Sequence, residues 1–121
     1  MKKLYKMKKG SVYYANLNRG IGSEQSGKRP VIVLQNTQGN ICSTTTIVVP
    51  LTNYENCKPE IPTHVILDNI EFLPYKSVAL VEQMRVIDKK RIMSYMGQLE
   101  DEYLELIDKK IITALNIKRR M

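Results

Sequence analysis

The sequence predicts a mainly β protein: a small, strongly curved antiparallel sheet or barrel with one C-terminal helix. Three observations support this. Short segments rich in β-branched and aromatic residues recur between residues 11 and 99, with Gly, Pro and Asn between them. A long helical periodicity of apolar residues follows residue 100. Neither a repeat nor a linker interrupts the 121 residues, which therefore form one domain.

Six strands are expected, at residues 11–17, 30–36, 44–52, 63–68, 77–81 and 93–99. The third is β-branched almost throughout. The second has too many consecutive apolar residues for a half-exposed face, so we expect it at the centre of the sheet. Because proline fits only the first residue or the edge of a strand, the second strand should begin at Pro30. The sixth strand should lie at an edge.

The connections differ in character. Residues 18–29 form a long polar loop whose backbone is made permissive by Gly22 and Gly27. Turns or irregular segments are expected at residues 37–43, 53–62 and 70–76, and a tight helical turn at residues 86–91. The last element is a helix over about residues 100–117. Its apolar stripe and acidic first turn predict packing against the sheet.

The net charge of +7 is concentrated at the two ends of the chain. Five lysines lie within residues 1–9, and three basic residues lie within 118–120. Without those eight, eleven basic residues stand against twelve acidic ones. Cationic ends raise non-specific affinity for a polyanion, or serve only as solvated termini. Any specific nucleic-acid site must therefore be local rather than a broad basic face.

Composition also excludes several classes of protein. No apolar run approaches the roughly 18 residues of a membrane span, and no apolar segment follows the lysine-rich start, so no secretory signal is expected. Cys42 and Cys57 lack a metal-like spacing and the chain has one histidine, so we expect no metal and no cofactor. Two scattered cysteines indicate reduced thiols and a cytoplasmic protein.

The polar loop delivers Arg29 to the mouth of an apolar strand, beside hydroxyl and amide side chains. A guanidinium presents a planar fork of donors that suits phosphate. Spacing alone favours an ordinary solvated arginine in a hairpin loop. Two interpretations therefore stand side by side: a phosphate-binding arginine, and a structural one paired with Glu24 or Glu82.

Residues 22–36 resemble the signature of the MazF/PemK family of toxin ribonucleases. Four further blocks resemble that family in the same order, at residues 10–17 (GSVYYANL), 48–52 (VVPLT), 62–65 (PTHV) and 81–89 (VEQMRVIDK). Together they extend from about residue 9 to residue 115. The family commonly has aspartate where this chain has Ser11 and Asn16, and proline where it has Arg19. These departures concern the first loop and hence the RNA sequence preference.

The resemblance implies an SH3-like barrel of the MazF/CcdB type that works as a homodimer. It would span residues 10–117, between basic tails at residues 1–9 and 118–121. It further implies the toxin of a toxin–antitoxin pair. Such a toxin is a ribosome-independent, sequence-selective endoribonuclease that cleaves single-stranded mRNA without a metal. Attack by the 2′-hydroxyl leaves a 2′,3′-cyclic phosphate and a 5′-hydroxyl.

The implied partner is a cognate antitoxin, whose acidic, disordered segment would fold onto the dimer and block the RNA groove. The complex of the two would bind DNA. Two other functions remain open on the same fold. One is a non-enzymatic inhibitor of the gyrase-poisoning type, and the other is an RNA-binding barrel whose binding is salt-sensitive and leads to no cleavage.

The resemblance places catalysis on Arg29 and Thr52. Because a guanidinium is effectively never deprotonated, we expect Arg29 to stabilise the phosphorane, with proton donation to the leaving oxygen as a further role. Thr52 ends the third strand, where its hydroxyl would donate to a phosphoryl oxygen. Glu24 is a candidate base or an orienting partner of Arg29. His64 is a candidate for catalysis or orientation because histidine is the side chain most suited to proton transfer near neutral pH, although a lone strand histidine is usually structural.

Four further residues are candidates for RNA contact: Ser23, Gln25, Lys28 and Gln83. For Ser23 and Gln25, hydrogen bonds within the loop are an equally good interpretation. Gln83 follows the fifth strand and is expected to support the site from beneath or to touch RNA.

Overall fold

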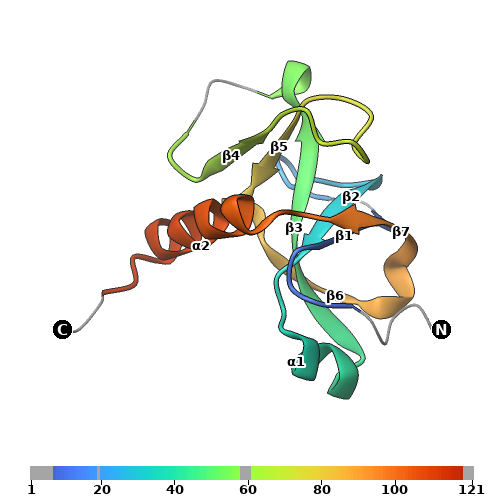
Figure 1. Ribbon diagram of the computed structural model, residues 1–121. Coiled ribbons are helices and arrows are strands. Elements are labelled where there is room, and N and C mark those ends of the chain that lie inside the picture. Colours follow the sequence, from blue (N-terminus) through green and yellow to red (C-terminus); the bar gives the residue numbers. More distant parts are fainter. Residues whose placement is uncertain (1–6, 19, 58–60, 119–121) are drawn as a thin grey trace.

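The structure is a computed structural model that describes residues 7–18, 20–57 and 61–118. Its described part contains seven strands, two α-helices and three short 3₁₀ helices (Figure 1). The strands are β1 (Ser11–Asn16), β2 (Lys28–Val33), β3 (Thr45–Asn53), β4 (His64–Leu67), β5 (Ser77–Leu80), β6 (Arg85–Asp88) and β7 (Ile92–Gln98). The helices are α1 (Thr37–Cys42), α2 (Asp101–Leu115), η2 (Tyr54–Asn56), η3 (Val81–Gln83) and η4 (Lys89–Arg91).

All the strand pairs are antiparallel, in the order β4-β5-β3-β2-β1-β7. The long strand β3 runs through almost the full height of the molecule and holds three neighbours (Figure 1). It pairs with β2 through residues 48–50, with β5 through residues 51–53 and with β6 through residues 45–48. Because β3 pairs with β2 up to Pro50 and with β5 from Leu51, the sheet opens at the start of β2.

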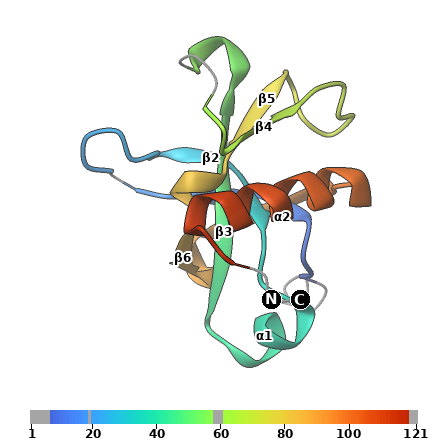
Figure 2. The same ribbon diagram turned by 90° about the vertical axis from the view of Figure 1, so that its left-hand side faces the viewer.

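Both faces of the central strands are buried. On one face, Val12, Ile32 and Val49 join a cluster that also contains Ile107 of α2. On the other face, Val31 and Val48 belong to a second cluster. Adjacent residues of β2 and β3 therefore enter different cores, and this explains their uninterrupted apolar sequences. Figure 2 shows α2 lying across the sheet.

The predicted fold class is confirmed: the chain is a mostly β antiparallel protein with one C-terminal helix. Each of the six expected strands is present, β2 is central, and β7 lies at the end of the strand order. The helix begins at Asp101 and ends at Leu115, and it packs on the sheet through the fully buried Ile107.

The predicted start of the second strand is wrong. The strand β2 begins at Lys28, so Pro30 is its third residue. It pairs with β1 along residues 28–32 but with β3 only from Val31 onward. Pro30 thus lies where one edge of β2 has no strand beside it, and its missing N–H interrupts no ladder bond on that side.

Two connections also differ from expectation. Residues 37–42 form the helix α1 instead of a turn, because the Asn36 side chain accepts a hydrogen bond from the Gly39 amide (2.8 Å) and caps the helix. Of the helical turn expected at residues 86–91, only the last three residues, Lys89–Arg91 (η4), are helical. Arg85–Asp88 form β6, since they find an open edge on β3.

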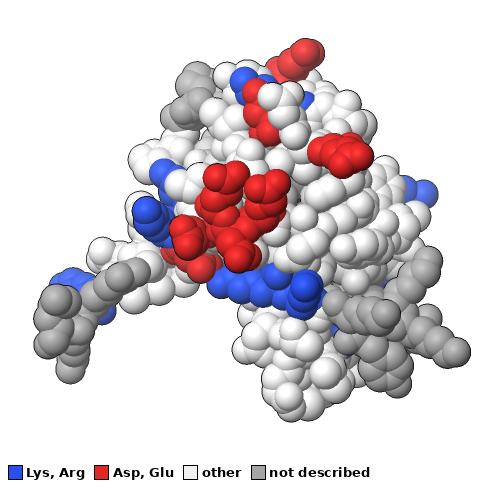
Figure 3. All heavy atoms as spheres, viewed as in Figure 1, with Lys and Arg blue, Asp and Glu red and all other residues white. Residues whose placement is uncertain are grey.

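Charge is unevenly distributed over the described surface. Acidic side chains gather over the first half of α2 on the face shown in Figure 3, where Asp101, Glu102 and Glu105 are. One of the helix carboxylates, Asp108, binds Lys9 at 2.7 Å. Of the basic tails, residues 1–6 and 119–121 lie outside the described residues, whereas Met7 is fully buried in the core.

Neither α-helix in the described part is long and apolar enough to cross a membrane.

We expect Gly97→Ala to destabilise the fold by about 1–3 kcal/mol, because a Cβ at Gly97 would lie 2.2 Å from Cδ2 of Phe72. The free energy of unfolding in urea measures this effect. Ser94→Ala on the same strand is the control, since Ser94 is exposed. Equal stability of the two variants would contradict the packing described here.

Candidate active site

The site lies where β2 and β3 separate. Their pairing ends at Val31 and Pro50, and from Leu51 onward β3 pairs with β5 instead. The separation leaves a cavity of about 140 Å³ between the start of β2 and the end of β3. It is lined by Lys28, Arg29, Pro30, Leu51, Thr52, Asn53, Asn56, Tyr75 and Ser77. Its volume equals that of about four to five liquid waters, which is room for a phosphodiester group.

Arg29 is fixed in this cavity by two backbone carbonyls. Its Nε donates to the Ser26 oxygen (2.9 Å) and its Nη1 donates to the Leu51 oxygen (3.1 Å). Among the described residues no carboxylate forms an ion pair with it, so the predicted alternative of a pairing with Glu24 or Glu82 is wrong. A guanidinium has five N–H groups, and these two bonds leave three for a ligand.

The electrostatics of the cavity favour an anion. Burial lowers the pKa of Arg29 from its ordinary value, and the phenol groups of Tyr75 and Tyr14 act in the opposite direction. A guanidinium remains charged despite such a shift. Lys28 contributes a second positive charge, and none of the residues lining the cavity is acidic. Burial also makes each hydrogen bond from Arg29 stronger than it would be in water.

Thr52 lies in the same cavity as Arg29. It pairs with Val78 of β5, and its backbone follows directly on the Leu51 carbonyl that holds Arg29. Arg29 and Thr52, from strands that are no longer paired here, thus line one cavity. A guanidinium and a hydroxyl are both hydrogen-bond donors suited to the oxygens of a phosphate.

The remaining loop residues lie apart from that cavity. Ser23, Glu24, Gln25 and Gln83 line a neighbouring cavity of about 540 Å³. Glu24 Oε1 accepts from the Ile21 amide (2.7 Å), so this carboxylate stabilises its own loop. The positive φ angles of Gly22 (57°) and Gly27 (75°) confirm the predicted need for glycine at both positions.

His64 interacts with Glu82 and Cys57 instead of lining the Arg29 cavity. Its Nε2 lies 3.2 Å from Glu82 Oε2, and its Nδ1 lies 3.7 Å from the sulfur of Cys57. Its side chain is 8% exposed, and it does not line the cavity of Arg29. The structure therefore brings Arg29, Thr52 and Lys28 together, but leaves His64 and Glu24 outside.

Sequence reasoning missed the residues that close the Arg29 cavity on the other side: Asn53, Asn56, Tyr75 and Ser77. Tyr75 belongs to an irregular segment, and the Ser77 hydroxyl donates to its carbonyl (3.0 Å). The polar composition of residues 53–62, interpreted as the rim of a groove, was the one available signal for Asn53 and Asn56. Nothing local in the sequence indicates that Tyr75 reaches Arg29.

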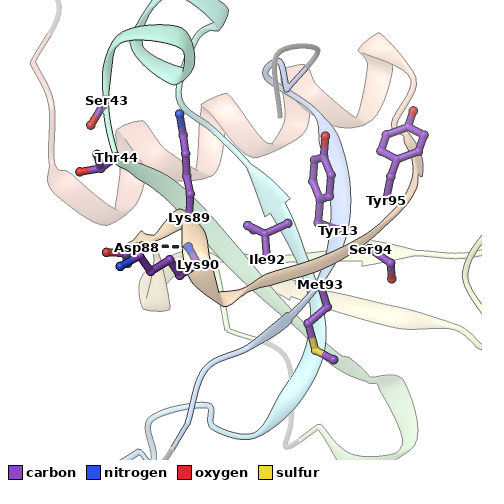
Figure 4. Close-up of a pocket in the computed structure, with 10 residues that line it drawn as sticks. All are labelled: Tyr13, Ser43, Thr44, Asp88, Lys89, Lys90, Ile92, Met93, Ser94 and Tyr95. Atoms are coloured by element: carbon purple, nitrogen blue, oxygen red, sulfur yellow. Dashed lines mark hydrogen bonds between the residues drawn. The ribbon is translucent and has the colours of Figure 1, made fainter. Parts of the chain in front are cut away.

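A wider cavity of about 750 Å³ lies beside β7, where Tyr13 and Tyr95 pack edge to face with ring centroids 5.3 Å apart (Figure 4). It contains none of the predicted site residues, and we assign it no part in the site.

In the described part of the chain, no group of three or more His, Cys, Asp or Glu side chains is placed to hold a metal ion.

The fold and the site together define a small β protein with a basic cavity at an opening in its sheet. Residues 8–115 match the family model described as the PemK-like, MazF-like toxin of type II toxin–antitoxin systems. The chain belongs to this family of MazF-like toxins. It is 41% identical over 110 residues to the endoribonuclease EndoA of Bacillus subtilis strain 168, a match covering 90% of this chain and 94% of that protein.

Solved structures share the fold. A mycobacterial endoribonuclease in complex with its cognate antitoxin matches with a TM-score of 0.77 and 20% identity, over 94% of this chain and 99% of that one. MazF from Deinococcus radiodurans matches with a TM-score of 0.78 and 22% identity, over 92% and 97% of the two chains.

Proposed function

We propose that this toxin is a ribosome-independent, sequence-selective endoribonuclease that cleaves single-stranded RNA at the cavity of Arg29 and Thr52. The observation that carries the proposal is the guanidinium of Arg29. It is held by two carbonyls, has no acidic partner among the described residues, and lines the same small cavity as Thr52. The 41% identity to an endoribonuclease supports the same activity.

In the proposed reaction the ribose 2′-oxygen attacks the adjacent phosphorus and the bond to the 5′-oxygen breaks. The 2′-hydroxyl loses its proton and the 5′-oxygen gains one. Negative charge builds up on the phosphoryl oxygens in the transition state, where the fixed N–H groups of Arg29 stabilise it. The Thr52 hydroxyl donates to one of these oxygens, and Lys28 attracts the RNA backbone from the exposed rim. The products are a 2′,3′-cyclic phosphate and a 5′-hydroxyl.

The proposal is tested by incubating the purified protein with a long single-stranded RNA in excess EDTA. We expect discrete cuts at one short sequence motif, with 5′-hydroxyl and cyclic phosphate ends, because the residues of the site supply the charge stabilisation. Sequencing of the fragment ends measures both the chemistry and the motif. Binding of several RNAs without any cleavage would contradict the proposal and would favour an RNA-binding protein.

The proposal includes a cognate antitoxin that binds the toxin and inhibits cleavage. A structurally similar endoribonuclease is described in complex with its cognate antitoxin, and this supports the same kind of partner for the present chain. The inhibitor would act by covering the cavity of Arg29 or by holding its loop away from RNA.

We further propose that the toxin is a homodimer. The strand β7 lies at the edge of the sheet, and two of its large apolar side chains, Met93 and Tyr95, are about half exposed. An exposed strand edge with apolar side chains favours pairing with a second chain. Sedimentation equilibrium tests the proposal: we expect about twice the 14.0 kDa mass of one chain, whereas a monomer at micromolar concentration would contradict it.

A further inference from the structure

The loop that precedes β2 and Arg29 is stabilised in two separate places. At its base, the Leu17 amide donates to Gly27 (2.8 Å) and the Gly27 amide donates back to Asn18 (2.7 Å). At its tip, residues 21–24 form a turn that is closed by bonds within the tip itself. Neither set of bonds fixes the tip relative to the rest of the sheet.

Gln83 makes the connection between the loop tip and the body of the protein. Its Oε1 accepts from the Gln25 amide (2.8 Å), and its Nε2 donates to the Ser23 carbonyl (3.2 Å). These residues are separated from Gln83 by 58 and 60 positions in the sequence. Among the described residues, they are the hydrogen bonds that join Ser23 and Gln25 to another element. The primary amide of glutamine suits this arrangement, since it supplies one acceptor and one donor at the same end.

The short helix η3 that carries Gln83 is itself anchored on its other side. The preceding residue, Glu82, accepts from the Thr63 hydroxyl (2.9 Å) and lies 3.2 Å from His64 Nε2. Val81 is fully buried in the core. The helix η3 therefore links the start of β4 to the loop before β2, and Gln83 extends from a rigid support.

We propose that Gln83 is a positioning residue for Arg29. The Gln25 amide that Gln83 holds lies one residue before Ser26, whose carbonyl accepts from Arg29 Nε. The Gly27 amide, in the same peptide unit as that carbonyl, is bound to Asn18, so holding Gln25 adds a restraint on the other side of Ser26. Gln83 does not line the cavity of Arg29 and Thr52, and it acts through the loop. This inference rests on the proposed function, because it gives Gln83 a purpose in RNA cleavage.

The test uses Gln83→Met, which keeps the length of the side chain but removes both hydrogen-bonding groups. We expect the ¹H–¹⁵N signal of Arg29 Nε to shift and broaden, and exchange of the Gln25 amide hydrogen to become about tenfold faster or more. In cleavage assays, kcat should fall about 10- to 100-fold because the guanidinium loses its orientation, whereas KM should change less than twofold. NMR of the full chain and steady-state kinetics provide these values.

Gln98→Met is the matched control. Gln98 also joins two segments, through Oε1 to Ser11 and through Nε2 to the Lys9 carbonyl, but it lies away from the loop. This variant should lower the melting temperature, because two hydrogen bonds are lost, while the Arg29 Nε signal remains unchanged. Gln83→Glu serves as a second variant, since it keeps the acceptor for Gln25 but replaces the donor to Ser23. Its Arg29 signal should lie between those of the wild type and Gln83→Met.

An unchanged Arg29 Nε signal in folded Gln83→Met would overturn the inference, whatever the cleavage rate. The signal is read without RNA, so the outcome is independent of the proposed function. If the wild-type protein does not cleave RNA but Gln83→Met moves the signal, the proposed function fails and the positioning of Arg29 by Gln83 stands.

Discussion

Replacing Arg29 by alanine should reduce the rate of RNA cleavage by about 10²- to 10³-fold, as expected when a preorganised donor to a developing anion is lost. The reason is geometric as well as electrostatic. Two carbonyls hold the guanidinium in place before RNA arrives, so no reorganisation is required in the transition state. Single-turnover cleavage of a short RNA that contains the mapped motif measures the effect.

Two variants control this result. Arg29→Lys keeps the charge but lacks the planar fork, and it should recover only a small part of the rate. Arg91→Ala is the matched arginine control, because Arg91 also donates to a carbonyl of the sheet, that of Asn16 (3.4 Å), but does not line the cavity. Its cleavage rate should stay within about threefold of the wild type. Equal losses in Arg29→Ala and Arg91→Ala would indicate a general effect on the fold.

Replacing Thr52 by valine should reduce the cleavage rate by about 10- to 100-fold. Valine matches threonine in shape, so the substitution removes the hydroxyl and little else. A hydrogen bond to a charged group contributes about 1.5–3 kcal/mol, which corresponds to this range. The apparent affinity for RNA should change less than the rate, because the bond strengthens as charge builds up on the phosphoryl oxygen.

Thr52→Ser provides the control for the loss of a hydroxyl. It retains the donor at the end of β3 and should cleave within a few fold of the wild-type rate. Full activity in folded Thr52→Val would show that the hydroxyl is dispensable and that Arg29 acts with a different partner in the cavity.

The local features of the site were predictable from the sequence. Gly22 and Gly27 indicated a loop with unusual backbone angles, and both have positive φ. The apolar run after Pro30 indicated a central strand, and β2 is buried on both faces. Such features depend on a few adjacent residues, whose conformational preferences survive in the fold.

The cavity itself was not predictable from local pattern. It exists because β3 exchanges its neighbour β2 for β5 at Leu51, and this depends on strand pairing between distant segments. The resemblance to a family, rather than any spacing, singled out Thr52. The contact of Gln83 with the loop, and the place of Tyr75 beside Arg29, likewise require the folded chain. The helix α1 was missed because its cap, Asn36, was assigned to the preceding strand.

The central claim is that the scissile phosphate binds between Arg29 and Thr52. A crystal structure with an RNA that carries a 2′-deoxynucleotide at the mapped cleavage site tests it most directly, since the attacking hydroxyl is then absent. We predict that one phosphate lies within hydrogen-bond distance of both the Arg29 guanidinium and the Thr52 hydroxyl. A scissile phosphate bound instead beside His64 and Glu82, or in the cavity lined by Gln83, would contradict the account.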